Sequence, residues 1–82
     1  MAEHTMPINL SEKKAQDLKE TIRDVYNSLD EKGYDAINQL AGYIISEDPT
    51  YITSHNNARV KITRLDRFDI LQEILTYYFD KE

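Results

Sequence analysis

An all-α fold is predicted for this chain by three observations. Apolar residues recur at helical spacing, helix-ending residues separate the apolar runs, and no long segment alternates polar and apolar residues as a half-buried strand does. We expect a compact bundle of four main helices and at most one short turn helix. Residues 1–10, which lack periodicity, are predicted to form a flexible N-terminal arm, and residues 11–82 a single helical domain.

The first helix is predicted to begin at Ser11, whose hydroxyl can accept a hydrogen bond from the first turn. It should end before Gly33, because glycine adopts the left-handed conformation after a helix at low cost. Its apolar face repeats at alternating spacings of three and four, at Ala15, Leu18, Ile22, Val25 and Leu29.

A second helix is predicted after Asp35, a good N-cap. Gly42 inside it costs about 1 kcal/mol relative to alanine, which favours a close helix contact at that point. Asp48-Pro49 ends the helix, and Pro49 can open a short turn helix. The expected buried face consists of Ile37, Leu40, Ala41 and Ile44.

Thr53 or Ser54 is predicted to cap a third helix, and Asp66 a fourth, with Asp69 completing a capping box. The fourth helix is apolar almost all round, which indicates a second surface to cover. We expect another subunit to cover it. Its apolar residues are Ile70, Leu71, Ile74, Leu75, Tyr77, Tyr78 and Phe79.

Composition narrows the function classes. The chain has 82 residues, a net charge of −5 and no cysteine. A single domain of this size has a small core and here lacks disulfides, so a homodimer is expected. The net negative charge disfavours binding to nucleic acid and to anionic membranes. No apolar run approaches the roughly 20 residues of a membrane span, and no signal peptide is recognised, so we expect a cytoplasmic protein.

The basic side of the third helix is a candidate docking surface. If residues 55–67 formed one continuous helix, Arg59, Arg64 and Arg67 would fall within a half-turn of one another. Guanidinium groups bind carboxylate and phosphate in bidentate fashion, so this face could dock an acidic partner or a phosphate group. The alternative is a solvated helix face that pairs loosely with nearby acids.

Neither catalysis nor a bound cofactor is expected. No nucleophile, base and orienting group occur together, and the two histidines, His4 and His55, do not have metal-ligand spacing. His55 is interpreted as a surface or capping residue beside the candidate docking surface. Thr5 on the predicted arm would be accessible to a kinase, and phosphate would add roughly −1.5 to −2 charges there. The alternative is an unmodified terminal hydroxyl.

The stretch from Val25 to Arg59 contains glycines, tyrosines and asparagines in a pattern that a helix alone does not require. Its most specific parts are Glu31-Lys-Gly-Tyr34, Asn38-Gln39, Gly42-Tyr43, Asp48-Pro49, Tyr51-Ile52 and Asn57-Ala-Arg59. In these, and from about Thr5 to Phe79, the chain resembles the IreB-like family (also called YrzL or ReoM) of small regulatory phosphoproteins of Gram-positive bacteria. The chain departs from the family pattern at Glu47, commonly glycine, at Thr63, often arginine, and at Phe68, usually acidic.

The resemblance implies a helical, cytosolic homodimer without enzymatic activity. It implies a substrate of the PASTA-domain Ser/Thr kinase and its partner phosphatase that regulates peptidoglycan synthesis and resistance to cell-wall antibiotics. In that picture the unphosphorylated form promotes degradation of the enolpyruvyl transferase MurA by the Clp protease, and phosphorylation relieves the effect. Thr5-Met6 matches the family phosphoacceptor, and the family's arginine-rich helix corresponds to Arg59, Arg64 and Arg67.

We therefore expect Thr5 as the phosphorylation site and a partner-binding set of His55, Arg59, Arg64 and Arg67. Expected partners are a second copy, the kinase and phosphatase, and a protein of the MurA/Clp protease pathway. Two other functions stay open. One is a dimeric helix-turn-helix-like nucleic-acid-binding module. The other is a structural subunit of a larger assembly.

Overall fold

The computed structural model describes the backbone of residues 2–80 and the side chains of residues 13–80. Within that part of the chain every regular element is helical, which confirms the all-α prediction. The elements, in chain order, are α1 (Ala2–Glu31), α2 (Ala36–Ser46), the 3₁₀ turns η1 (Pro49–Tyr51) and η2 (His55–Asn57), α3 (Ala58–Thr63) and α4 (Arg67–Asp80).

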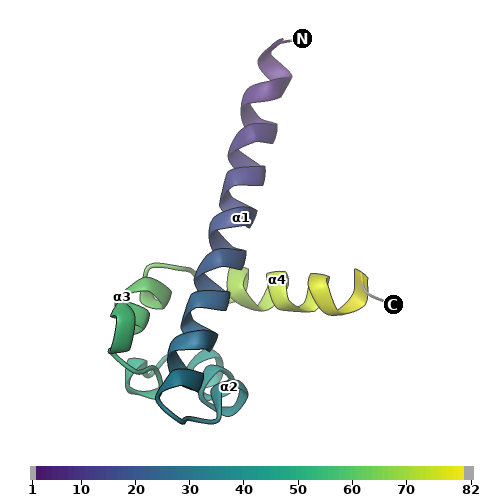
Figure 1. Ribbon diagram of the computed structural model, residues 1–82. Helices are drawn as coiled ribbons and strands as arrows, with labels where there is room; N and C mark the ends of the chain where they lie inside the picture. The colour runs from purple at the N-terminus through teal and green to yellow at the C-terminus, as the bar shows by residue number, and fades with distance from the viewer. Residues whose placement is uncertain (1, 81–82) are drawn as a thin grey trace.

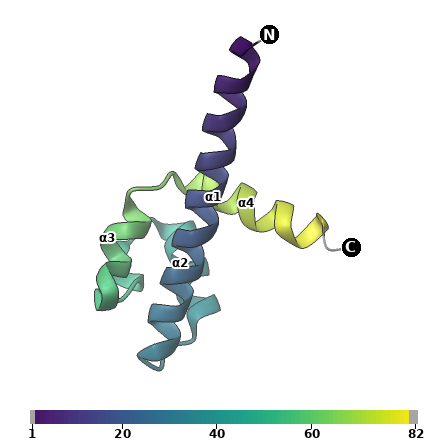
Figure 2. The ribbon, with the colours of Figure 1, turned by 45° about the horizontal axis from the view of Figure 1, so that its top comes forward.

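The 30-residue α1 is the axis of the molecule (Figure 1). Elements α2, η2 and α3 pack against its C-terminal half, and η1 packs against α2 and α3. α4 crosses α1 and leaves the body on the side away from α3, as a second view confirms (Figure 2). The globule is therefore built on one end of α1.

The predicted helix start at Ser11 is wrong, because α1 begins at Ala2 and runs through residue 11 without interruption. The apolar pattern detects only the part of a helix that packs. Once a helix has formed, each further residue adds one hydrogen bond without a new nucleation cost, so the helix can extend beyond its packed face. The mobility predicted for residues 1–10 stays a prediction.

The end of α1 confirms the role predicted for Gly33, which has φ +83°. The Tyr34 N–H donates to the Leu29 carbonyl at 3.0 Å, and the Gly33 N–H donates to the Asp30 carbonyl at 3.0 Å. This pair of bonds is the Schellman motif, which satisfies carbonyls left without partners at a helix end. The motif turns the chain sharply into α2.

Asp35 caps α2 as predicted, since its carboxylate accepts from the Asn38 N–H at 3.2 Å. The predicted buried face of α2 is confirmed at Leu40 and Ile44 and wrong at Ile37, which is 67% exposed, and at Ala41, which is also exposed. α2 is apolar on several sides, so helical spacing fits more than one face. Tertiary packing selects Ala36, Leu40 and Tyr43.

Gly42 makes the close contact that the sequence predicted, although its neighbour is not another long helix. The Tyr51 ring of η1 lies directly against the Gly42 backbone, where a β-carbon would collide with it. The Gln39 side chain holds this turn by donating to the Tyr51 carbonyl at 2.9 Å. Asp48 caps η1, accepting from the Thr50 N–H at 3.0 Å and the Thr50 hydroxyl at 2.7 Å, and Pro49 opens this turn as predicted.

The hydrophobic core joins α1 to all three later helices. Its members are Leu18, Val25, Leu29, Ala36, Leu40, Tyr43, Ile52, Ala58, Ile62 and Ile70. Ile22, Ile44, Leu65 and Ile74 pack against it while staying partly exposed. α4 contributes Ile70 and Ile74 and leaves the opposite side of the helix open to solvent.

Candidate functional site

The segment that carries the predicted basic surface is not one helix. η2 and α3 meet at a kink where Asn56 and Asn57 have left-handed backbone angles, with φ 57° and 61°. Asparagine tolerates this conformation better than most residues. The Asn56 side chain is tied to α1 through bonds of 3.4 Å to the Ser28 hydroxyl and the Glu31 carboxylate. A second break follows, because α3 ends at Thr63 and α4 begins at Arg67. Arg59, Arg64 and Arg67 therefore do not share one helix face.

Arg59 lies in α3 and turns back onto its own chain. Its Nε donates to the Ile52 carbonyl at 2.9 Å, and its backbone N–H donates to the Thr53 carbonyl at 3.1 Å. The side chain is partly buried. A charged donor on a backbone carbonyl makes a strong hydrogen bond. Arg59 thus holds the connection between η1 and η2 in place.

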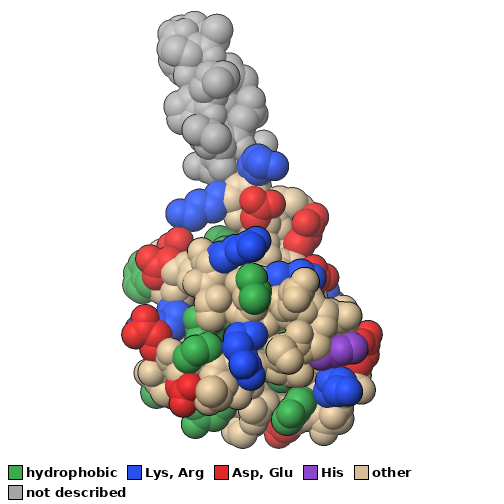
Figure 3. All heavy atoms as spheres, turned by 90° about the vertical axis from the view of Figure 1, so that its left-hand side faces the viewer, with side chains coloured by type: hydrophobic (Ala, Val, Ile, Leu, Met, Phe, Trp, Pro, Cys, Tyr) green, Lys and Arg blue, Asp and Glu red, His purple; other side chains and the backbone are tan. Residues whose placement is uncertain are grey.

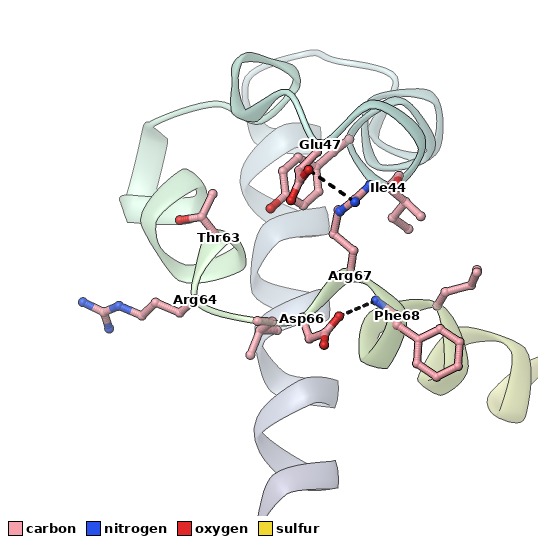
Figure 4. A pocket seen from close by; sticks show the side chains of 10 residues that line it. Ile44, Glu47, Thr63, Arg64, Asp66, Arg67 and Phe68 are labelled. Carbon is pink, nitrogen blue, oxygen red and sulfur yellow. Dashed lines mark hydrogen bonds and ion pairs between the residues drawn. The ribbon is translucent and has the colours of Figure 1, made fainter.

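Arg67 begins α4 and reaches the end of α2. Its Nη1 donates to the Ile44 carbonyl at 2.6 Å, and its Nη2 lies 3.4 Å from the Glu47 carboxylate (Figure 4). Carbonyls in the last turn of a helix lack partners within the helix, and a cation there also compensates the helix dipole. Arg67 therefore caps α2 from a different helix and fixes how α4 departs.

Arg64 differs from the other two arginines. It follows the last residue of α3, is exposed, and its guanidinium points away from the body (Figure 4). Among the side chains of residues 13–80 it forms no ion pair. Of the predicted arginine set, only Arg64 keeps its full charge available to a partner.

His55 pairs with the end of α1. Its Nε2 lies 2.8 Å from the Glu31 carboxylate, and its backbone N–H donates to the Thr53 hydroxyl at 3.2 Å. It therefore stabilises the turn that precedes α3, in agreement with a surface role. The face that carries α3 shows cations scattered among polar, apolar and acidic groups instead of one continuous basic patch (Figure 3).

The connection from α3 to α4 carries further polar structure. Asp66 caps α4 as predicted, accepting from the Phe68 N–H at 2.9 Å. Asp69, predicted to complete a capping box, instead pairs with Lys14 on α1 at 3.2 Å. This pair anchors the start of α4 to α1.

A groove of about 610 Å³ opens between the end of α2 and the start of α4. Its lining, drawn in Figure 4, comprises Tyr43, Ile44, Glu47, Thr63, Arg64, Leu65, Asp66, Arg67, Phe68 and Leu71. Burial raises the pKa of the Tyr43 phenol; the Arg67 charge opposes this effect and the Glu47 charge adds to it. The groove combines one free cation with an exposed aromatic ring, Phe68.

Sequence reasoning did not identify this groove. It noted Phe68 and Glu47 only as positions where the chain departs from the family pattern. A signal was present, because Phe68, Leu71, Leu75 and Tyr78 repeat at spacings of three, four and three on a side of α4 next to that of Ile70 and Ile74. Which of the two sides packs inward could not be read from spacing alone.

Three remaining predictions concern the phosphorylation site, metal binding and membrane-spanning helices. The Thr5 side chain lies outside the described side chains, and its backbone belongs to α1. Within the described residues, no three histidine, cysteine or acidic side chains are grouped as metal ligands. No helix in the described chain has the length and apolarity to cross a bilayer.

Comparison with protein families shows that the sequence matches one family model over nearly its whole length. The family model described as IreB regulatory phosphoprotein matches residues 3–80, nearly the whole chain. The matched range contains the three arginines, the cap of α2 and the turn at Pro49. The chain therefore belongs to the IreB regulatory phosphoprotein family.

Proposed function

We propose that this protein is a non-enzymatic regulator that is switched by phosphorylation and docks a partner protein through the surface around Arg64. The family match over residues 3–80 is the observation that carries the proposal, and it supports a regulatory phosphoprotein role. The free guanidinium of Arg64 supports the location of the docking surface.

The proposed modification site is Thr5, phosphorylated by a PASTA-domain Ser/Thr kinase and dephosphorylated by its partner phosphatase. The proposed output is control of peptidoglycan synthesis and cell-wall antibiotic resistance through turnover of MurA by the Clp protease. The site of action would be the cytoplasm. Phosphate at Thr5 would add negative charge to the N-terminal part of α1, far along the chain from Arg64.

Homodimer formation is part of this proposal. The C-terminal half of α4 projects from the body and exposes Leu75, Tyr78 and Phe79 at 46%, 60% and 61%. The Tyr78 and Phe79 rings form an edge-to-face pair 5.1 Å apart. A soluble small domain gains stability when a second copy covers such side chains. Sedimentation at micromolar concentration should therefore give the mass of a dimer.

The kinase step has a direct test. The purified protein is incubated with the cognate kinase domain and ATP, and the phosphopeptide is identified by mass spectrometry. We expect phosphate on Thr5 and no incorporation in Thr5→Ala. Thr76→Ala, which removes an exposed hydroxyl of α4, is the matched control and should be phosphorylated as the wild type is. Undiminished incorporation in Thr5→Ala would remove this residue from the proposal.

The docking step is best tested at Arg64. Arg64→Glu should abolish capture of the target in affinity purification from the native cell, with helicity and unfolding midpoint unchanged. Arg23→Glu, at an exposed cation of α1, is the control and should capture normally. Charge reversals at Arg59 or Arg67 are less informative, because each would also break a hydrogen bond to a backbone carbonyl. Normal capture by Arg64→Glu would show that this surface is not used.

The nucleic-acid alternative finds little support in this arrangement. Phosphate-backbone binding requires several available cations. Of the arginines in this region, Arg59 and Arg67 are committed to carbonyls of their own chain. α3, which would be the recognition helix, has only six residues.

A further inference from the structure

The outer side of α2 carries an apolar strip that no described part of the chain covers. Ile37 and Ile45 are 67% and 83% exposed, the two highest values among the large apolar side chains described, and Ala41 between them is also exposed. Residues four apart lie on one side of a helix, so these three form a continuous line. At about 1.5 Å per residue the line is about 12 Å long, which is roughly two helical turns.

The fold does not account for two isoleucines at these positions. The caps of α2 are supplied by Asp35 and by the left-handed Glu47, and the inward side by Ala36, Leu40 and Tyr43. A solvated helix position is better filled by alanine, lysine or glutamate than by a β-branched residue. Single exposed apolar residues are common, whereas aligned ones that form a patch point to an interaction. The strip is therefore a candidate contact surface, and it lies beside the C-terminal end of α1 (Figure 1).

Both ends of the strip are acidic. Asp35 precedes α2 and Asp48 follows it, both are exposed, and residues 33–58 contain three carboxylates and no lysine or arginine. The third carboxylate, that of Glu47, is paired with Arg67 at 3.4 Å. Asp35 and Asp48 are bonded only to neutral donors, so their negative charges are not compensated by those contacts.

The Asp48 end is the more negative of the two. The Thr50 hydroxyl and the Thr50 N–H donate to Asp48 and lower its pKa, with the Arg59 charge as the smallest contribution, so this carboxyl is ionised at neutral pH. The C-terminal end of a helix adds a partial negative charge there, whereas Asp35 lies at the partly positive N-terminal end. The Arg59 guanidinium is bound to the Ile52 carbonyl, and that of Arg64 points away from the body (Figure 4).

We infer that the outer side of α2 docks a basic amphipathic helical segment of a partner protein. The apolar face of the segment would cover Ile37, Ala41 and Ile45, and a lysine or arginine beyond that face would pair with Asp48. Apolar residues at positions i, i+4 and i+7 of a helix span about 11 Å, close to the length of the strip. This surface is separate from the one around Arg64, so the inference goes beyond the proposed function.

Charge complementarity selects this occupant. An acidic segment or an anionic membrane would be repelled by Asp35 and Asp48. A second copy that placed its α2 against this one would bring the same acids together in either direction of the helices. A purely apolar ligand would cover the strip but leave both carboxylates without a counter-charge. A segment that is apolar in its centre and basic at its ends satisfies all parts of the surface.

The test uses the full-length protein and a defined probe. The probe is a fluorescein-labelled 16-residue peptide with three leucines spaced by four and three, alanines between them and lysines at both ends, titrated by anisotropy at low salt. We expect saturable binding that weakens at least about tenfold in Ile37→Ala/Ile45→Ala, because this variant removes the apolar area that the leucines would cover. Val60→Ala, at an exposed aliphatic residue of α3, is the control and should stay within about twofold.

A second pair of variants tests the acidic ends. Asp35→Asn/Asp48→Asn removes two charges and keeps both caps, because the amide oxygen accepts the same hydrogen bonds. Its affinity should fall about fivefold at low salt, and the salt dependence should become shallower. Asp17→Asn/Glu20→Gln removes two exposed acids of α1 and should stay within about twofold. Circular dichroism of every variant confirms that the fold is kept.

Three outcomes would overturn the inference at the level of the strip. They are unchanged affinity in Ile37→Ala/Ile45→Ala, equal losses in the two acid variants, and equal binding of a probe with its leucines replaced by serines. Each of them would reduce the interaction to general attraction between an acidic protein and a basic peptide. A probe with its lysines replaced by glutamates should bind at least about tenfold more weakly, and equal binding would exclude a role for the acids.

Two further measurements separate other occupants from a basic segment. A lower mass of Ile37→Ala/Ile45→Ala in sedimentation velocity would mean that another copy of the chain covers the strip, and the inference would be wrong. Co-sedimentation with phosphatidylglycerol vesicles that this variant loses would assign the strip to a lipid surface and would also overturn it. None of these outcomes involves Thr5 or Arg64, so a failure here leaves the proposed function intact.

Discussion

The contact between Gly42 and the Tyr51 ring provides the sharpest test of the packing. A β-carbon on Gly42 would lie 2.7 Å from Tyr51 Cδ1 and 2.8 Å from Cζ, well inside van der Waals contact. Helix propensity alone would make Gly42→Ala more stable by about 0.8–1 kcal/mol. Overpacking typically costs about 1–3 kcal/mol, so the steric term should exceed the propensity term.

Gly42→Ala is therefore expected to lower the free energy of unfolding by about 1 kcal/mol, the difference between these two effects. The Tyr51 ring is 37% exposed and can turn outward, but its backbone carbonyl is held by Gln39, so relief is incomplete. In a Tyr51→Ala background the same substitution should be stabilising by about 1 kcal/mol, because only propensity remains. The coupling between the two sites is then about 2 kcal/mol.

Urea unfolding followed by circular dichroism measures all four members of this cycle. Ala41→Gly at the adjacent exposed position of α2 calibrates the local cost of glycine and should destabilise by about 1 kcal/mol. Equal stabilisation by Gly42→Ala in the wild type and in Tyr51→Ala would refute the account, because it would show that the ring does not rest on the helix backbone.

Three further predictions follow from the end of α2. Because burial raises the pKa of Tyr43 above its ordinary value of 10.0, the unfolded chain loses this proton first as pH rises. The free energy of unfolding should thus fall above pH 10, and urea titrations should show a shallower fall in Tyr43→Phe; identical slopes would contradict the assignment. Glu47→Gly should stabilise by up to about 1 kcal/mol, since the left-handed backbone at φ 65° favours glycine and the exposed ion pair it removes is weak. A lower urea midpoint would show that the pair outweighs the backbone strain. Arg67→Met should cost about 1–2 kcal/mol because the Ile44 carbonyl loses its donor, whereas Arg64→Ala should stay within about 0.5 kcal/mol. Equal losses in the two variants would contradict the division of the arginines into structural and free groups.

Local chemistry made several elements predictable. Gly33, Asp35 and Asp66 act where the sequence placed them, because caps and left-handed turns depend on side chains within a few residues. The apolar face of α1 was also predictable, since Leu18, Val25 and Leu29 are the buried positions of a single clear stripe.

The errors occurred where more than one helix face or boundary was compatible with the spacing. α2 offered two apolar faces, and packing against α1 chose the one with Ala36 and Tyr43 instead of Ile37. The continuous helix assumed over residues 55–67 is broken at Asn56 and Asn57, where the Asn56 side chain is bonded to α1, and again between Thr63 and Arg67. No local signal distinguishes such a kink from a helix start.

The residues alone determined that the chain is helical, where most helices are capped, and that it belongs among regulatory phosphoproteins. They did so because caps, periodicity and family patterns are properties of neighbouring positions. Only the tertiary structure determined which of the three arginines are hydrogen-bonded, because a guanidinium is engaged only where the fold brings a carbonyl near it. Arg59 donates to the Ile52 carbonyl and Arg67 to the Ile44 carbonyl, whereas the guanidinium of Arg64 points into solvent.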